Sequence, residues 1–165
     1  MKAFKIIPLL LFLIFIMSCK DEPEEEEPKI AISGITERDG NGELTGNNDP
    51  ADWNLNTTFN SMENKLFRSD DLAICADAED SIYNVQVYPN PNDGVFNFET
   101  IIPNESISVR IVDDQLDVLF SKDSITGGTL TISENGDGGT RKVRLYYRVY
   151  NGACKYQGYG DIFIR

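Results

Sequence analysis

Short runs that alternate apolar and polar residues dominate the chain from residue 83 to residue 150. Successive side chains of a strand point to opposite faces, so this alternation predicts strands with one buried face and one wet face. Gly, Pro, Asn and Asp bound the runs and predict turns. The predicted strands are 83–88, 96–99, 107–111, 116–121, 130–133, 141–150 and a closing strand at 161–165. No helices long enough for parallel crossovers separate them, so the pattern predicts an all-β sandwich of antiparallel sheets.

The connections give further expectations. Residues 134–139 are rich in Gly and Asn, which accept positive φ, and they predict a hairpin between the strands at 130–133 and 141–150. Apolar residues indicate a first strand at 30–36, and residues 39–52 read as a loop. Oxygens recur in that loop as in a calcium site, but Leu44 and Pro50 stand where an EF-hand needs Gly and Glu. We therefore expect no metal there.

One short helix is expected before the strands. Phe59, Met62 and Leu66 recur at spacings of three and four residues, which places them on one side of a helix. Thr57 or Thr58 would cap its N-terminus. The helix should pack its apolar side against a sheet.

The N-terminus carries a targeting signal. Two lysines precede an apolar run at 6–17, whose twelve residues would span about 18 Å as a helix. A bilayer core of about 30 Å needs about 20 residues, so a secretory signal fits better than a membrane span. The run ends in Ile16-Met17-Ser18-Cys19, which resembles the lipobox of bacterial lipoproteins. That resemblance implies a signal peptide at 1–18 and a lipidated thiol on Cys19, which would bind membrane lipid.

An acidic linker follows at 19–29. Like charges and two prolines prevent collapse, so this linker should be a disordered, solvated tether. A Lys followed by acidic residues after the lipidated Cys also resembles the export signal of Bacteroidetes-type surface lipoproteins. This resemblance implies a lipid anchor in the outer membrane that faces the exterior, and the periplasmic face stays open. The remaining residues, 30–165, suffice for a single domain.

Charge and composition exclude several functions. The chain has 15 Lys+Arg against 27 Asp+Glu, a net charge of -12, so nucleic acid would be repelled. It has no histidine, which removes Ser-His and Cys-His catalysis and imidazole zinc ligation. We expect no cofactor. Cys75 and Cys154 remain once Cys19 is lipidated, and an even pair in an oxidising compartment favours a disulfide over two buried thiols.

Residues 87–94 form the most specific internal motif. Val87-Tyr-Pro-Asn-Pro-Asn-Asp-Gly94 precedes Phe96 and Phe98, and its prolines force the chain out of a strand. The motif resembles the opening of the C-terminal sorting domain of type IX secretion cargo. The resemblance extends over 85–165, with its strength in 85–120, and implies an immunoglobulin-like sandwich. Two departures are Asp113, which lacks the family's Gly three residues later, and the absence of a late Gly-x-Tyr strand.

Candidate binding residues lie in the strand at 141–150. If the odd positions are core, the even positions form an outward stripe that could contact a glycan or a surface protein. The alternative is cross-strand pairing of its arginines with Asp and Glu. Trp53 is either an exposed ligand platform or a ring half-buried beneath a loop. The candidate ligand-binding residues are Arg144, Tyr146, Arg148, Tyr150 and Trp53.

These features predict a non-catalytic binding module anchored at the cell surface. Two alternatives stay open. One is a structural accessory subunit of an outer-membrane assembly. The other is a glycan hydrolase that uses two carboxylates, for which Asp113, Asp114 and Asp117 are close in sequence.

Overall fold

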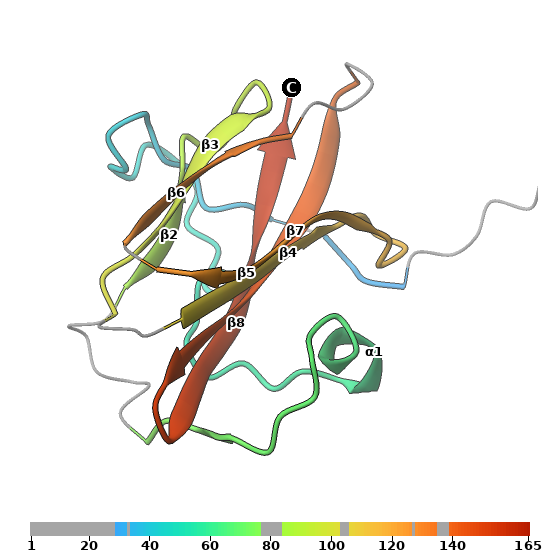
Figure 1. Cartoon of the computed structure of the whole chain (residues 1–165). Coiled ribbons are helices and arrows are strands. Elements are labelled where there is room, and N and C mark those ends of the chain that lie inside the picture. Colours follow the sequence, from blue (N-terminus) through green and yellow to red (C-terminus); the bar gives the residue numbers. More distant parts are fainter. Residues whose placement is uncertain (1–28, 33, 77–83, 103–105, 127, 135–138) are drawn as a thin grey trace, which may run out of the picture.

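The computed structural model describes residues 29–165 apart from 33, 77–83, 103–105, 127 and 135–138. The described part is an all-β sandwich, as predicted, with one sheet in the order β1-β8-β7-β4-β5 and a second in the order β2-β3-β6 (Figure 1). The signal peptide, Cys19 and the tether up to residue 28 lie outside the described residues. The elements are α1 (Ser61–Asn64), β1 (Ala73–Ile74), β2 (Val85–Tyr88), β3 (Val95–Thr100), β4 (Ser106–Val112), β5 (Val118–Ile125), β6 (Thr129–Ser133), β7 (Arg141–Asn151) and β8 (Cys154–Ile164).

The period-two alternation places the core between the two sheets. Val85 and Val87 of β2 and Phe96 and Phe98 of β3 are buried from one side. The alternating apolar residues of β4 and the odd positions of β7 are buried from the other side. Tyr147 lies fully buried at the centre and contacts the ring of Phe98. Burial of these side chains, at about 25 cal/mol per Å² of apolar surface, is the main stabilisation of the sandwich.

Four expectations about the strands were wrong. The described residues of 30–36 form no strand, and β8 begins at Cys154 rather than at 161. The two strands beside residues 134–139 are not hairpin partners, because β6 pairs with β3 while β7 pairs with β4 and β8. The sheets are not wholly antiparallel, because the two-residue β1 pairs with β8 in parallel. Both edges of β7 are paired, with β4 and with β8, so neither is free for β6, which pairs with β3 and buries Ile132 in the core.

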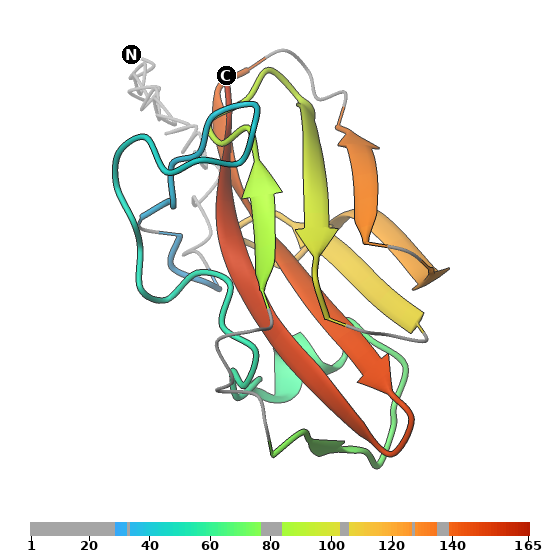
Figure 2. The ribbon, with the colours of Figure 1, turned by 90° about the vertical axis from the view of Figure 1, so that its left-hand side faces the viewer.

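The free edge of β8 is covered by residues far away in the sequence. The backbone N–H of Trp53 donates to the carbonyl of Tyr159 (2.7 Å), and Thr57 N–H donates to the carbonyl of Gln157 (3.0 Å). These residues end the N-terminal segment, a name used here for residues 29–57. Figure 2 shows this segment, in blue and teal, beside β8. The approach requires glycine at position 160, because a Cβ there would overlap the indole of Trp53. An edge covered in this way cannot template pairing with another chain.

The motif at 87–94 makes a second contact with β8. Asn90 is fully buried, and its amide donates to the carbonyls of Thr36 (3.0 Å) and Asp161 (2.9 Å). Its side-chain oxygen accepts from Phe163 N–H (3.0 Å). Both X-Pro bonds of the motif are cis. Whatever its role in export, this motif joins the N-terminal segment to the last strand.

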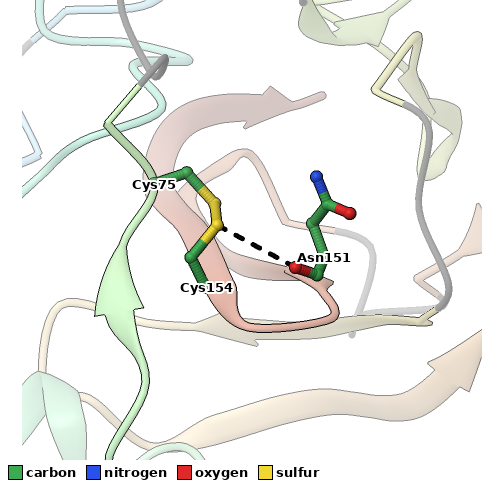
Figure 3. Close-up of a disulfide and its surroundings, with 3 residues drawn as sticks. All are labelled: Cys75, Asn151 and Cys154. Carbon is green, nitrogen blue, oxygen red and sulfur yellow. Dashed lines mark hydrogen bonds between the residues drawn. A yellow bond between two sulfur atoms is a disulfide. The ribbon is translucent and has the colours of Figure 1, made fainter.

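The predicted disulfide between Cys75 and Cys154 is confirmed (Figure 3). It ties the residue after β1 to the first residue of β8, and Cys75 N–H donates to the carbonyl of Lys155 (3.0 Å). The two Cα atoms lie 5.1 Å apart, and 79 residues separate the cysteines. The Cys154 sulfur lies 3.9 Å from the carbonyl oxygen of Asn151. This is a van der Waals contact and not a hydrogen bond, because a disulfide sulfur carries no hydrogen.

Removal of this disulfide is expected to destabilise the fold. In the chain-entropy model a loop of this length stabilises by about 4–5 kcal/mol. We therefore expect the double variant Cys75→Ala, Cys154→Ala to lose about 4 kcal/mol of unfolding free energy in denaturant titrations. Wild type under reducing conditions should show a similar loss. An unchanged denaturation midpoint in both experiments would contradict this prediction.

Candidate functional site

The outer face of the five-stranded sheet is covered, and this corrects the expected exposure of the even positions of β7. Arg144, Tyr146 and Arg148 are 7%, 0% and 2% exposed, and only Tyr150 is partly exposed. The cover is residues 53–75, here called the strap, which includes α1, together with residues 30–32 beside Arg144 and Tyr146. These even positions therefore cannot form the proposed outward stripe. The alternative from the sequence, cross-strand pairing, holds for Arg144 with Asp161 of β8, whereas Arg148 pairs with Asp70 of the strap.

A second apolar cluster lies between the sheet and the strap. Phe59 and Phe67 of the strap pack on Tyr146 of β7 and Val112 of β4, together with Ile30. The short helix within the strap is confirmed, but its N-cap is Asn60 rather than Thr57 or Thr58. Its expected apolar side was wrong, because the helix spans only Ser61–Asn64, Phe59 and Leu66 lie outside it, and Met62 is exposed. Glu63 completes a capping box with Asn60, and its other oxygen accepts from the Tyr146 hydroxyl (2.8 Å). Burial, and then the Glu63 carboxylate, raise the pKa of Tyr146.

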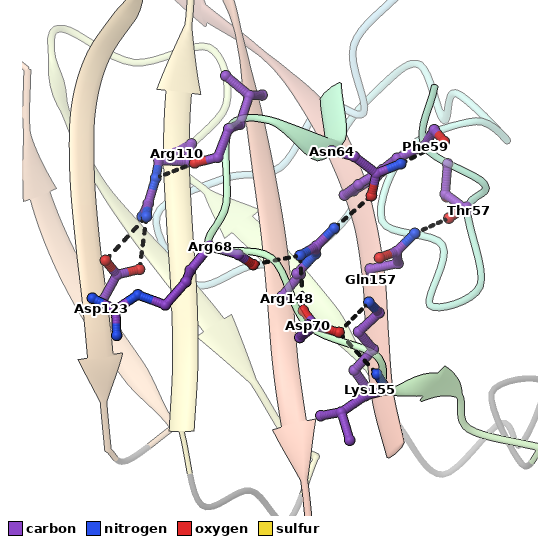
Figure 4. A network of polar contacts seen from close by, with 12 residues as sticks. Thr57, Phe59, Asn64, Arg68, Asp70, Arg110, Asp123, Arg148, Lys155 and Gln157 are labelled. Atoms are coloured by element: carbon purple, nitrogen blue, oxygen red, sulfur yellow. Dashed lines mark hydrogen bonds and ion pairs between the residues drawn. The ribbon is translucent and has the colours of Figure 1, made fainter. Parts of the chain in front are cut away.

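Arg148 holds the strap to β7 through both ends of its guanidinium (Figure 4). One terminal nitrogen lies 2.9 Å from Asp70, and the other donates to the Asn64 side chain (2.6 Å). The guanidinium also lies over the Phe67 ring, 4.7 Å from its centroid. Lys155 of β8 donates to the second oxygen of Asp70 (2.6 Å). Burial is the largest single influence on Asp70 and would raise its pKa. The bond and charge of Lys155, the backbone N–H of Leu72 and the charge of Arg148 together outweigh burial, so the pKa of Asp70 is lowered.

Arg110 makes an equivalent link from β4. It donates through Nε to the carbonyl of Leu66 (2.8 Å) and makes two bonds to Asp123 of β5 (2.8 and 3.0 Å). The β4–β5 register shifts beside Asp123, where Ser124 has a positive φ of 56°, and this bulge presents the carboxylate to Arg110. Burial would raise the pKa of Asp123. Hydrogen bonds from Ser108 and Arg110 oppose this effect, and the pKa of Asp123 is lowered.

Arg144 links the sheet to the N-terminal segment. It forms a bidentate pair with Asp161 of β8 (2.6 and 2.8 Å) and donates to the carbonyl of Ala31 (2.9 Å). Its guanidinium lies 4.1 Å from the centroid of the Tyr159 ring. Burial alone would lower the pKa of Arg144, but the paired Asp161 raises it. The pair is buried, so removal of one partner would leave an uncompensated charge.

Substitution of Arg148 tests whether the strap depends on these links. Arg148→Ala should lower the unfolding free energy by about 3–5 kcal/mol, because Asp70 loses a buried partner and Phe67 loses a stacked guanidinium. Arg68 provides a matched control, because its side chain is exposed, and Arg68→Ala should cost less than about 1 kcal/mol. Denaturant unfolding monitored by circular dichroism measures both. Equal effects of the two substitutions would contradict the structural role of Arg148.

Trp53 is half-buried, in agreement with the second alternative for this residue. Its ring packs against Gly160 and the core, and it stacks on Tyr147 with ring centroids 6.4 Å apart. Its backbone has a positive φ of 61°. This ring therefore seals the edge of the core beside β8.

Two buried carboxylates, Asp52 and Asp161, lie next to each other behind the N-terminal segment. Asp52 accepts from the backbone N–H of Thr36 (2.8 Å) and of Asp161 (2.9 Å). Burial, with a smaller contribution from Asp161, raises the pKa of Asp52 to about 6 despite these bonds. A raised carboxyl pKa beside a second carboxylate is a feature of acid catalysis. Here, however, backbone donors and Arg144 occupy the oxygens, so the pair joins chain segments.

The raised pKa of Asp52 predicts a pH dependence of stability. Folded Asp52 binds its proton more tightly than unfolded Asp52, so its stabilisation is complete below pH 4 and is lost as the pH rises through about 6. The loss should be at most about 3 kcal/mol. Asp52→Asn should flatten this part of the stability curve in unfolding titrations at pH 4–8. Asp39→Asn should not, because hydrogen bonds from Asn41 and Glu43 lower the pKa of Asp39. Burial also raises the pKa of Asp161, so part of the slope should remain, and the prediction fails if the slope is as steep in Asp52→Asn as in wild type.

Asp113, Asp114 and Asp117 lie around a turn after β4. One oxygen of Asp113 accepts the backbone N–H groups of Gln115 and Asp117 (both 2.9 Å), so it shapes the turn. The Asp39 loop is built in the same way, because Asp39 accepts from the backbone of Asn41 (2.8 Å) and Glu43 (3.0 Å). Among the described residues, no group of three or more Cys, Asp or Glu side chains could hold a metal ion.

A concavity with a volume of about 700 Å³, here called the N-terminal cavity, lies where the described chain begins. Ile30, Ile32 and Leu119 contribute an apolar wall. Asp113 and Asp114 line it after β4, and the first residues of β7 line it from the other side. Its volume falls within the range of about 300–1,000 Å³ typical of small-molecule sites.

Two smaller hollows flank the strap. One, of about 460 Å³, is bordered by Lys65, Asp70, Arg148 and Lys155, whose charges are largely paired with each other. The other, of about 230 Å³, contains Tyr150 among serine side chains. The structure therefore brings Arg148 and Tyr150 to two separate hollows and places Arg144, Tyr146 and Trp53 in neither. The N-terminal cavity is the better candidate site because it is larger and combines apolar and charged groups.

Sequence reasoning missed two cavity residues, Arg141 and Lys142. They begin β7, where their positive charge on an acidic chain was the available signal. Comparisons with protein-family models, curated proteins and solved structures find no match to this chain. Within the described residues, no helix is both long and apolar enough to cross a bilayer.

Proposed function

We propose that this chain is an extracytoplasmic lipoprotein whose β-sandwich binds a ligand without catalysing a reaction. The anchor would be Cys19, with residues 19–29 as the tether to the outer membrane. The single observation that carries the proposal is the Cys75–Cys154 disulfide. Structural disulfides persist in oxidising compartments, so the bond supports the export that the Ile16-to-Cys19 lipobox implies.

The N-terminal cavity supports the binding role. It is a formed concavity with convergent polar groups, whereas the carboxylate pair with a raised pKa is enclosed behind the N-terminal segment. We propose no export role for residues 87–94, and we assign Asn90 of this motif a structural role through its three hydrogen bonds. Their likeness to a sorting domain then concerns the fold.

Lipidation at Cys19 can be tested on the full-length chain in its producing cells. Intact mass spectrometry should show loss of residues 1–18 and an added acyl mass, and the protein should fractionate with the outer membrane. Protease treatment of intact cells should degrade it if it faces the exterior. Cys19→Ser should abolish the acyl mass and release the protein from the membrane.

Cys154→Ser is the matched control, because it removes a cysteine outside the lipobox and should keep the acyl mass. Wild-type protein that retains Met1 and carries no acyl group would overturn the anchor. Resistance to protease in intact cells, with degradation after outer-membrane lysis, would place the anchored protein on the periplasmic face.

A further inference from the structure

The hollow of about 460 Å³ beside the strap, here called the strap hollow, carries more positive than negative charge. Lys65 of the strap, Arg148 of β7 and Lys155 of β8 line it, together with the single carboxylate of Asp70. Although burial would raise the pKa of Asp70, the bonds and charges around it lower that pKa, so its carboxylate is ionised at neutral pH. Three cations against one anion leave an excess of positive charge on the lining, whichever of them are paired.

Contacts within the protein use only part of this positive charge. Arg148 is closed to a ligand, because its side chain is 3% exposed and its terminal nitrogens bond to Asp70 and Asn64. The Lys155 ammonium has three hydrogens and donates one of them to Asp70 (2.6 Å). The Lys65 side chain is exposed, and its ammonium has no hydrogen-bond or ion-pair partner among the described residues. Lys65 and the remaining hydrogens of Lys155 are therefore the groups left for a ligand.

The acidity of the whole chain does not cancel this local excess. The chain carries a net charge of -12, but at physiological ionic strength charges are screened over about 8 Å. Asp71, the exposed carboxylate next to Asp70, does not line the strap hollow. A concave lining of one sign also concentrates the field between its walls. An anion inside the hollow would therefore respond to the lining cations rather than to distant carboxylates.

The walls of the strap hollow are fixed by bonds that do not involve a ligand (Figure 4). The side-chain amide of Asn64 donates to two carbonyls of the strap itself (both 2.9 Å), and its oxygen accepts from Arg148 (2.6 Å). Asp70 also accepts from the backbone N–H of Leu72 (3.1 Å). The disulfide at Cys75 ties the end of the strap to β8. A ligand would not have to order these walls, which lowers the free-energy cost of binding.

The lining favours a hydroxylated ligand over an apolar one. Among the described residues that line the strap hollow, Phe67 is the one apolar side chain, and the Arg148 guanidinium covers its ring, 4.7 Å from the centroid. The exposed Ser69 side chain has no partner among the described residues, and its hydroxyl can donate or accept. The volume of about 460 Å³ falls within the range of about 300–1,000 Å³ typical of small organic ligands.

We infer that the strap hollow binds a sugar acid, a ligand the size of a single pyranose ring that carries a carboxylate. The inference goes beyond the proposed function, because this site is separate from the N-terminal cavity. The ligand carboxylate would accept hydrogen bonds from Lys65 and Lys155, and charged partners make such bonds stronger. Ser69 would bond to a hydroxyl of the ring. A neutral sugar would leave the excess positive charge of the lining without a partner.

Calorimetric titration of the full-length, detergent-solubilised chain tests this inference. The probes are D-glucuronate, glucose as its neutral counterpart, and inorganic phosphate as an anion without a sugar ring. We expect D-glucuronate to bind about tenfold more tightly than either of the other two probes. Lys65→Gln should weaken D-glucuronate binding about fivefold, which is the upper range for a solvent-accessible charge pair. Lys65→Glu should weaken it further, because it adds a repelling charge.

An exposed lysine on β5 supplies the matched control. Lys122→Gln makes the same chemical change outside the strap hollow and should leave the affinity for D-glucuronate unchanged. Because both lysines are exposed, Lys65→Gln and Lys122→Gln should keep the wild-type melting temperature, and thermal melts check this. Ser69→Ala is a second variant of the site and should weaken D-glucuronate binding about fivefold through the loss of one hydrogen bond.

Equal affinity for D-glucuronate and glucose would overturn the role of the positive charge. Absence of D-glucuronate binding, or an equal loss in Lys65→Gln and Lys122→Gln, would overturn the site altogether. Phosphate that binds as tightly as D-glucuronate and is weakened by Lys65→Gln would reject the sugar acid in favour of a simple anion site. Failure of the proposed function would instead show as an unlipidated protein that retains Met1, so the two failures are distinguishable.

Discussion

The fold depends on the burial of both faces of the five-stranded sheet. Three arginines allow the outer face, beneath the strap, to be buried. One face of β7 packs on the three-stranded sheet through an apolar core. The other face carries Arg144 and Arg148, with Arg110 beside them on β4, and each guanidinium pairs with a carboxylate and stacks on an aromatic ring. A charge can be buried when it is paired and hydrogen-bonded. The strap is therefore held over the sheet by polar groups as well as by Phe59 and Phe67.

This arrangement also explains which parts of the fold could be predicted. Alternation in residues 85–150 gave the strands and the core positions, because period two is a local property of the sequence. It could not show that the even positions of β7 are covered, since the cover comes from residues 53–75 and leaves no mark in the strand itself. The strand predicted at residues 30–36 was wrong. Ile30 is buried, as its apolar side chain suggested, but it packs in the cluster beneath the strap and not within a sheet. The length of β8 was hidden by glycines, which the strap requires.

The disulfide could be predicted from the sequence, whereas the candidate site could not. The disulfide was predictable because assigning Cys19 to the lipobox-like motif left one pair among the three cysteines. The N-terminal cavity could not be found that way, because its walls come from residues 30–32, from the turn after β4, from β5 and from the start of β7. Asp113 and Asp114 attracted attention as adjacent acids, but only the fold places Arg141 opposite them. Tyr150 and Arg148, chosen from one strand, belong to separate hollows on the strap side.

The position of the cavity relates the proposed anchor to the proposed ligand. If Cys19 is lipidated, ten residues connect it to Lys29, the first described residue, and at about 3.3–3.6 Å each they reach at most about 36 Å. The cavity begins at Ile30, so a bound ligand would be held within a few nanometres of the bilayer. The glutamates of the linker raise the negative charge around this approach, so a polyanion would be repelled before it reached the cavity.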